Sequence, residues 1–200
     1  MTAEKKFNIR KLTYLAILTS IVIVLQFAGS FIRLSPTFSI SLVLVPIVLG
    51  VALCDTLSGA WLGFIFGCMV FASGDATLFL QINPFGTIIT VLLKGILCGL
   101  LAGITYKMVS KFNKYVGIIV AAIVCPLVNT GIFLLGCRLF FFETISSWAA
   151  GEGVGAIAYM FLFLVGGNFL FELLFNIVLS PAILKLVNIA EKGYDNIKRK

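Results

Sequence analysis

The sequence predicts an all-α membrane protein, a bundle of six transmembrane helices in one integral membrane domain that covers residues 1–200. Two features of the composition lead to this fold class. Apolar residues make up 60% of the 200 residues, and charged residues only 12%, about half of the roughly 25% that is usual in soluble domains. A soluble chain of this length would have too few polar residues to cover its surface.

The apolar residues also fall into six segments that polar connections separate, which is the third observation. A transmembrane helix needs about 20 apolar residues, and the second and third segments are short for that. These two could instead form a re-entrant pair. The connections are expected to be loops, including residues 29–39 with Pro36, residues 74–84 and residues 143–153. The expected spans cover residues of about 12–28, 40–53, 59–73, 85–106, 115–141 and 156–187.

Basic residues are concentrated in alternate connections of this topology. Twelve of the 15 lie in the N-terminal segment, between the fourth and fifth spans, and in the C-terminal tail. Cytoplasmic segments of membrane proteins carry such an excess of Lys and Arg. Both termini are therefore expected in the cytoplasm, with the chain spanning the cell membrane. Nucleic-acid binding is disfavoured, because the basic residues are divided among three segments instead of forming one face.

The sequence offers little for catalysis. It contains no His, and its five Cys are spread singly, so we expect neither a metal site nor a catalytic triad that uses His. No P-loop motif occurs, so ATP cannot bind in that way. We expect no cofactor and no enzymatic activity. An intramembrane enzyme that uses Lys94 in a Ser–Lys dyad and a scaffold without a solute are the rival interpretations.

Small residues recur at intervals of four in three spans. Such a stripe lets another backbone approach closely. In the third and fourth spans we expect helix packing inside the bundle, whereas Ala16 and Ser20 of the first span are candidates for docking a partner membrane protein. The packing candidates are Gly59, Gly63, Gly67, Gly95, Gly99 and Gly103.

Ionisable and amide side chains inside the spans are the candidates for a binding site, because such groups are costly in a bilayer. Lys94 lies about ten residues into the fourth span, roughly 15 Å deep. It could form a structural ion pair with Glu172 or hold an anionic or carbonyl-rich solute. Asn168 and Glu172 share one face of the sixth span, and Asn129 of the fifth span could join them.

Three further polar residues lie near the expected outer mouth of the bundle. Gln81 and Asn83 precede Pro84 at the start of the fourth span, and Arg138 lies near the end of the fifth. Gln81 and Asn83 could be turn residues or could contact the solute. Arg138 could extend to the interface or bind an anionic group.

Several of these segments resemble the substrate-binding S components of energy-coupling factor (ECF) transporters. The second and third spans carry the similar motifs PIVLG from Pro46 and GAWLGFIFG from Gly59. The fourth span adds NPFG from Asn83 and LKG from Leu93. In the first span, Ala16 and Ser20 are similar to the family's Ala-x-x-x-Ala motif, with Ser at its second position as a departure.

The resemblance implies a six-helix subunit in the plasma membrane of a prokaryotic cell. It would capture a vitamin at the extracellular side, under the loops that follow spans one, three and five. A transmembrane coupling protein would meet the face of Ala16 and Ser20, and two ATPase subunits would supply the energy. The Asn83–Phe85 segment and Lys94 look most like the pantothenate-type branch. Riboflavin, folate and other vitamins are the alternatives.

Overall fold

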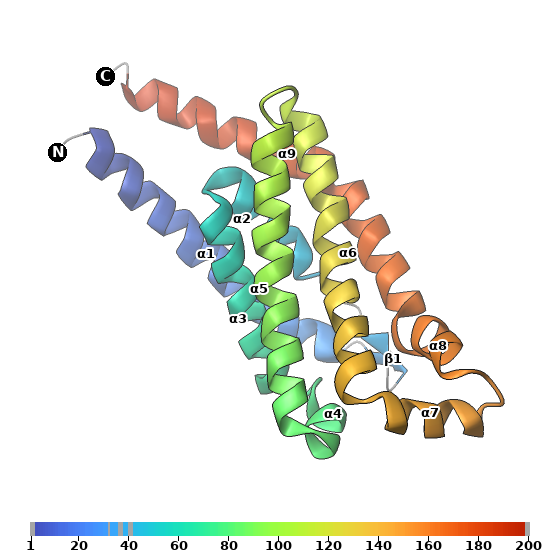
Figure 1. The fold of residues 1–200 in the computed structure, drawn as a ribbon. Coiled ribbons are helices and arrows are strands. Elements are labelled where there is room, and N and C mark those ends of the chain that lie inside the picture. The colour runs from blue at the N-terminus through green and yellow to red at the C-terminus, as the bar shows by residue number, and fades with distance from the viewer. Residues whose placement is uncertain (1–2, 32, 36–37, 40–41, 199–200) are drawn as a thin grey trace.

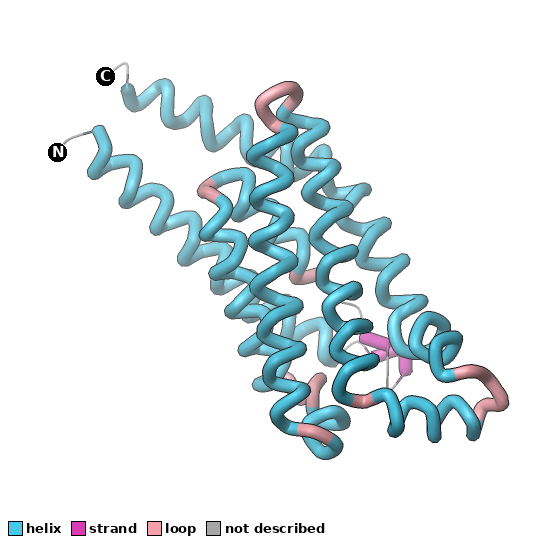
Figure 2. Tube along the Cα trace, viewed as in Figure 1, coloured by secondary structure: helices cyan, strands magenta, loops and turns pink. Residues whose placement is uncertain are grey.

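The computed structural model of the chain describes residues 3–31, 33–35, 38–39 and 42–198, with side chains over residues 9–30 and 42–193 (Figure 1). Helices account for most of the described chain (Figure 2). Pro36 of the expected first loop lies outside the described residues.

The first half of the chain contains three helices that match expected spans, and it has regular secondary structure in two segments where loops were expected. The expected loop 29–39 carries the end of the first helix and an antiparallel hairpin, and the expected loop 74–84 contains a short helix. The elements are α1 (Ala3–Phe31), β1 (Arg33–Ser35), β2 (Phe38–Ser39), α2 (Leu44–Leu53), α3 (Thr56–Ala72) and α4 (Thr77–Ile82).

The second half contains α5 (Pro84–Val109), α6 (Lys114–Phe140), α7 (Phe142–Gly151), α8 (Ala156–Tyr159), the π-helical segment η1 (Met160–Val165) and α9 (Gly166–Lys198). The expectation of a loop over residues 143–153 was wrong for most of that range, because α7 occupies it. Its residues Ile145 and Ala149, four apart, are buried on one face. Ile145 belongs to an apolar cluster with Phe141 and Met160, and this packing stabilises a helix in a segment with several polar residues.

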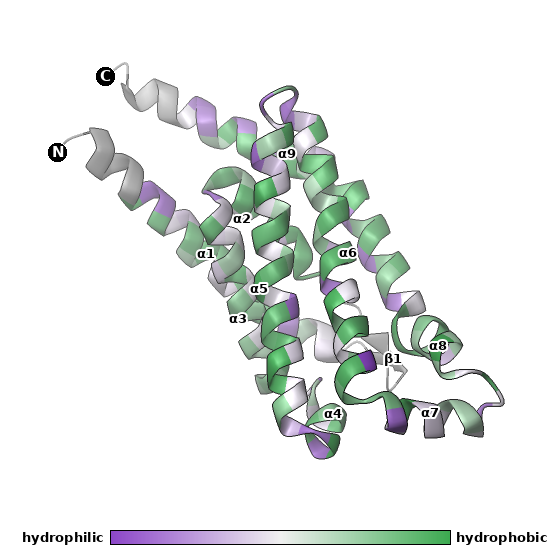
Figure 3. Ribbon diagram, in the orientation of Figure 1, coloured by the Kyte–Doolittle hydropathy of each residue, from purple (hydrophilic) through white to green (hydrophobic). Residues whose placement is uncertain are grey.

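Within the described residues, four helices are long and apolar enough to cross a membrane. Two others, Leu44–Leu53 and Thr56–Ala72, are apolar but shorter. Hydrophilic residues lie mainly toward the ends of the long helices, whose middle parts are predominantly hydrophobic (Figure 3). The chain is therefore a helical, multi-pass membrane protein. The four candidate spans are Ile9–Ser30, Pro84–Val109, Lys114–Phe140 and Ala156–Gly193.

Side chains cap the N-termini of three of the helices. The Asp55 carboxylate accepts a hydrogen bond of 2.7 Å from the backbone N–H of Ser58 at the start of α3. The Asn83 amide oxygen accepts one of 2.9 Å from Gly86 at the start of α5, where Pro84 is the first helical residue. Asn113 does the same for α6. Such caps satisfy N–H groups that have no partner within the helix.

Both termini lie at the same end of the bundle, together with the connection between α5 and α6 (Figure 1). We call this the terminal end, and the opposite one the α4–α7 end. Polar contacts join the helices at the terminal end. Lys11 of α1 forms an ion pair with Asp55, and Lys114 forms one with Glu191 of α9. The Arg10 guanidinium of α1 donates to a backbone carbonyl of α9.

Helices α3 and α5 pack with their backbones in close contact, through the glycines that recur every four residues. A Cβ atom added to Gly63 would lie 1.9 Å from the carbonyl oxygen of Gly95, and one added to Gly99 would lie 2.0 Å from the carbonyl oxygen of Gly59. Gly67 faces the backbone of Val91. The interface therefore has no room for side chains at these positions, and α5 is held at a fixed depth and rotation beside α3.

Candidate functional site

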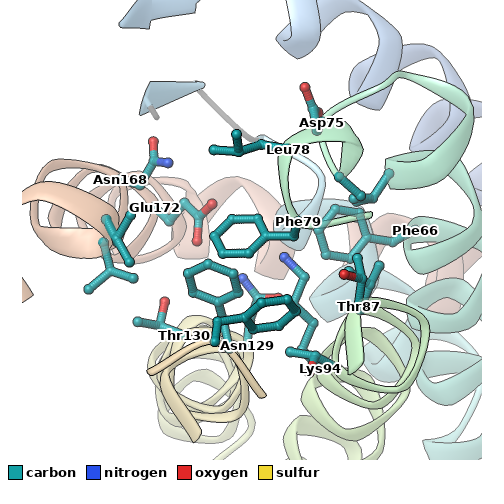
Figure 4. A pocket seen from close by; sticks show the side chains of 18 of the residues that line it. Phe66, Asp75, Leu78, Phe79, Thr87, Lys94, Asn129, Thr130, Asn168 and Glu172 are labelled. Atoms are coloured by element: carbon teal, nitrogen blue, oxygen red, sulfur yellow. The ribbon is translucent and has the colours of Figure 1, made fainter. Parts of the chain in front are cut away.

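A cavity of about 180 Å³ lies inside the bundle at the α4–α7 end. Its volume is roughly a dozen times the space that one bound water needs, so it is large enough for a small organic solute. The lining side chains come from α1, α3, α4, α5, α6, η1, α9 and the α3–α4 turn. Figure 4 shows side chains of these elements converging on the space around Phe79.

Lys94 of α5 supplies the cavity with its one lysine or arginine side chain among the described residues. Its ammonium nitrogen lies 5.5 Å from the ring centroid of Phe66 and 5.4 Å from that of Phe133. Both distances fall within the range of a cation–π contact. No described residue forms a hydrogen bond or an ion pair with this ammonium group, which has three donors to satisfy. Lys94 is thus oriented by two rings and remains available to an acceptor in the cavity.

Glu172 of α9 provides a buried carboxylate on another wall of the cavity, and it is 6% exposed. The Asn129 side chain of α6 is a polar neighbour of this carboxylate on the cavity wall. No salt bridge of 4.0 Å or less joins Glu172 to Lys94 within the described part of the chain. The two groups attract each other through space, and both line the cavity.

Two buried oxygen atoms on the cavity wall lack a hydrogen-bond partner among the described residues. They are Oδ1 of Asn129 and Oγ1 of Thr90. Both residues are buried, at 6% and 4% exposure. Because a buried polar atom without a partner costs free energy, these atoms favour an occupant of the cavity, solute or water, that forms hydrogen bonds with them.

A second polar group closes the cavity beside α1. The Gln26 amide nitrogen donates to Asp75, at 2.7 Å, and to the hydroxyl of Ser73, at 3.2 Å. The Ser73 hydroxyl also lies 3.1 Å from the Asp75 carboxylate. Gln26 is 5% exposed. These contacts fix the α3–α4 turn against α1 and place Asp75 on the cavity wall.

Aromatic rings cover the cavity at the α4–α7 end. Phe79 of α4 makes edge-to-face contacts with Phe133, Phe141 and Trp148, at centroid distances of 5.6, 5.0 and 6.4 Å. These partners lie on α6, at the α6–α7 junction and on α7. The Phe79 ring of the short helix α4 therefore contacts three other parts of the chain at the α4–α7 end of the cavity.

The structure brings four of the seven sequence-derived site residues together on the cavity wall, namely Lys94, Asn129, Asn168 and Glu172. They come from three helices, α5, α6 and α9.

The other three residues lie elsewhere. Gln81 is exposed. Asn83 is the N-cap of α5, so its amide oxygen already binds a backbone N–H. Arg138 is exposed and its guanidinium lies 3.9 Å from the ring centroid of Phe142. None of the three is among the residues that line the cavity.

The sequence argument missed several lining residues. Thr87 and Thr90 share a face of α5 with Lys94, at intervals of three and four residues, so helical spacing could have identified them. Gln26 is the one polar residue between Ser20 and Gly29, which was a weaker signal. Phe66, Phe79 and Phe133 are individually unremarkable in a chain with 19 Phe.

The candidate docking residues on α1 lie on its uncovered face. Ala16 and Ser20 are both exposed, beside the large exposed side chains of Ile17 and Val24. The Ser20 hydroxyl donates to the Ala16 carbonyl oxygen, at 3.1 Å. Its polar group is therefore satisfied within α1, and Ser20 presents a small surface comparable to that of Ala.

Fold and cavity together define a class: a multi-pass helical membrane protein with a small polar site enclosed in its bundle, suited to binding a small molecule. The comparison with known families specifies this further. Residues 10–184 match the family described as ECF transporter, substrate-specific component. The chain belongs to this family and is the substrate-specific subunit of an ECF importer, which binds a small molecule and associates with coupling and ATPase modules. No curated protein and no solved structure matches the chain.

Proposed function

We propose that this subunit captures a vitamin that carries an anionic group, with pantothenate as the best candidate. The observation that carries the proposal is the Lys94 ammonium group, which lies in the cavity between two phenyl rings with no acceptor from the described residues. A carboxylate would satisfy its donors with charge-assisted hydrogen bonds. Asn129 and Thr90 supply hydrogen-bonding groups for the rest of the molecule.

Riboflavin and folate are the alternative vitamins. Riboflavin is uncharged and would leave Lys94 without a counter-charge. Folate carries two carboxylates, whereas the cavity wall offers one lysine and the two carboxylates of Asp75 and Glu172. A monoanion of modest size suits these charges better than either.

Six membrane crossings with both termini in the cytoplasm are the topology that this proposal includes. Lys11 at one end of α1 pairs with Asp55, just before α3, and Gln26 near the other end binds Ser73, just after α3. Helix α3 therefore runs parallel to α1, in the same direction, over about 15 residues, or roughly 22 Å. This depth supports α3, with α2, as a pair of crossings despite their short apolar segments.

The orientation follows from charge. The three segments with most of the basic residues are the two termini and the α5–α6 connection, and these lie at the same end of the bundle (Figure 1). The positive-inside rule assigns this end to the cytoplasm. The cavity then lies at the end of the bundle that faces the outside of the cell, where an importer must meet its solute.

A binding screen tests the proposed function. The full-length chain, purified in detergent, is incubated separately with pantothenate, riboflavin, folate, thiamine and biotin, and its thermal unfolding is followed. A solute at 100 times its dissociation constant should stabilise the fold by about 2.7 kcal/mol, which raises the melting temperature measurably. We expect pantothenate to give the largest shift. A screen in which no vitamin stabilises the chain would contradict the proposal.

A further inference from the structure

The described wall of the cavity carries more acidic than basic side chains. Lys94 is the single lysine or arginine on its described wall, whereas Glu172 and Asp75 are carboxylates. Asp75 already accepts hydrogen bonds from Gln26 and Ser73 at the edge of the site. Glu172 lies deeper and has fewer partners, so it is the acidic group with most capacity left for a solute.

The Glu172 carboxylate has unused hydrogen-bonding capacity. An ionised carboxylate has about four lone-pair positions, and no described side chain forms a well-aligned hydrogen bond with it, although Asn129 and Lys94 are its neighbours. The Oδ1 atom of Asn129 is a second buried acceptor on the cavity wall, without a partner among the described residues. Two neighbouring acceptors favour a group that donates, and they disfavour one that is itself negatively charged.

From this arrangement we infer that Glu172 determines specificity by requiring a hydrogen-bond donor, a hydroxyl or an N–H group, on a solute whose anionic group binds Lys94. The inference rests on the proposed function, since it assumes that the cavity holds the transported solute. The solute then carries an anionic group at one end and a hydrogen-bond donor at the other. A molecule with a carboxylate alone would leave the acceptors at Glu172 unpaired, and a dianion would place a second negative charge beside them.

A matched set of simple probes tests this requirement without knowledge of the natural solute. Hexanoate, ω-hydroxyhexanoate, ω-aminohexanoate and adipate share one carboxylate and one chain length, and they differ only at the far end. Their dissociation constants are measured on the full-length chain by titration calorimetry. We expect the hydroxy or the amino compound to bind about tenfold or more tightly than hexanoate, as for hydrogen bonds to charged groups, and adipate to bind most weakly.

The comparison of the hydroxy and amino compounds then distinguishes a hydroxyl from an ammonium donor. The variant Glu172→Gln should reduce the preference over hexanoate to about threefold or less, because its neutral amide accepts a weaker hydrogen bond. It should also bind adipate more tightly than the natural chain does. Glu191→Gln is the matched control, because Glu191 lies on the same helix at the terminal end and pairs with Lys114. This control should keep the natural ranking.

Several results would overturn the inference. Hexanoate or adipate could bind as tightly as the donor-bearing probes, Glu172→Gln could retain the full preference, or none of the four probes could bind. The ranking on the natural chain decides the matter by itself if the variant does not fold. A vitamin that stabilises the chain while the probe ranking fails would leave the proposed function intact. If no vitamin stabilises the chain, the proposed function fails as well.

Discussion

Lys94 is the residue on which the account of the site depends most. An ammonium group inside a bilayer-spanning bundle costs free energy unless it is paired or solvated. The rings of Phe66 and Phe133 offset part of this cost. The contacts with the two rings also fix the direction of the side chain, so a solute that binds Lys94, as proposed, would meet a cation that is already positioned. Such preorganisation lowers the ordering cost of binding.

Replacing this cation should weaken the binding of an anion selectively. Lys94→Met keeps a long apolar side chain but removes the charge, so we expect the affinity for pantothenate to fall by about tenfold or more. Panthenol, in which an alcohol replaces the carboxylate, should lose much less affinity. Lys185→Met serves as the control, because Lys185 is exposed on α9. Calorimetry that finds equal losses for both compounds would show that Lys94 does not contact the anionic group.

Asp55 has a structural role that should appear in the pH dependence of stability. Burial by itself raises the pKa of this carboxyl, but hydrogen bonds from Lys11 and Ser58 outweigh it, so the pKa lies below its usual value. A lowered pKa means that the carboxylate stabilises the fold at pH values above about 4, and that this contribution is lost as the pH falls through the lowered value.

Asp55→Ala should therefore cost about 1 kcal/mol at neutral pH, the usual value of an N-cap. The difference from the natural chain should shrink as the pH falls below about 4. Thermal unfolding in detergent across this range measures both quantities. A difference that is the same at low and at neutral pH would argue against an ionised cap.

Sequence reasoning found Lys94, Asn129, Asn168 and Glu172 because each is a polar residue in a long apolar span, where its cost demands a reason. It could not separate them from Arg138, since exposure at a helix end depends on how the helices pack. The hydrogen bonds between Gln26 and the α3–α4 turn could not be predicted from the sequence either. The two segments are 47 residues apart, and only the packing of α3 against α1 brings them together.

Among the elements, the pair of α3 and α5 has the strictest packing requirement. Gly63 and Gly95 face each other so closely that each would place a Cβ atom within 2.2 Å of the opposite carbonyl oxygen. Close backbone approach of this kind replaces the hydrophobic driving force that helices lack in lipid. Because α5 carries Lys94, Thr87 and Thr90 of the cavity wall, this interface also sets the geometry of the site.

Gly63→Ala should accordingly destabilise the protein by about 1–3 kcal/mol, the usual cost of overpacking, and lower the melting temperature. Gly131→Ala on α6 is the matched control, because a Cβ atom there meets nothing within 4 Å. The control should be neutral or stabilising by up to about 1 kcal/mol, since Ala favours helix. Equal melting temperatures for the two variants would contradict the close α3–α5 packing.

Element prediction succeeded where hydropathy dominates and failed where tertiary packing decides. The apolar segments became helices near their expected positions, with α1 and α9 extending beyond the apolar parts. Helix α7 was missed because its segment has Ser, Thr and Glu on one side, and only the buried face with Ile145 and Ala149 stabilises it. The short helix α4 likewise depends on contacts of Phe79 with three distant rings.

In the whole molecule, two separate surfaces are candidates for the two functions of an ECF substrate-specific component, which are solute binding and association with the coupling and ATPase modules. The cavity lies at the α4–α7 end, whereas Ala16 and Ser20 lie on the exposed face of α1 toward the terminal end. Helix α1 contributes only Gln26 to the described cavity wall. A change on its exposed face should therefore affect assembly with the coupling protein and leave solute binding unchanged.

Ala16→Leu tests this separation, because a large side chain would prevent close approach of a partner helix. We expect pantothenate to bind as before, while co-purification with the coupling and ATPase modules and vitamin uptake by cells are lost. Ala182→Leu makes the same change on an exposed position of α9 and should retain both. Normal uptake by the Ala16→Leu variant would show that the exposed face of α1 is not the docking face.

The central claim is that the cavity around Lys94 and Glu172 holds a small monoanion with a donor group at its other end. The most direct measurement is the mass and fragmentation spectrum of the compound that the freshly purified, full-length chain releases on denaturation. The account predicts a single vitamin-sized molecule with one carboxylate and at least one hydroxyl or N–H group, absent from a Lys94→Met sample. Release of a neutral or cationic compound, or of the same compound from both samples in equal amounts, would contradict it.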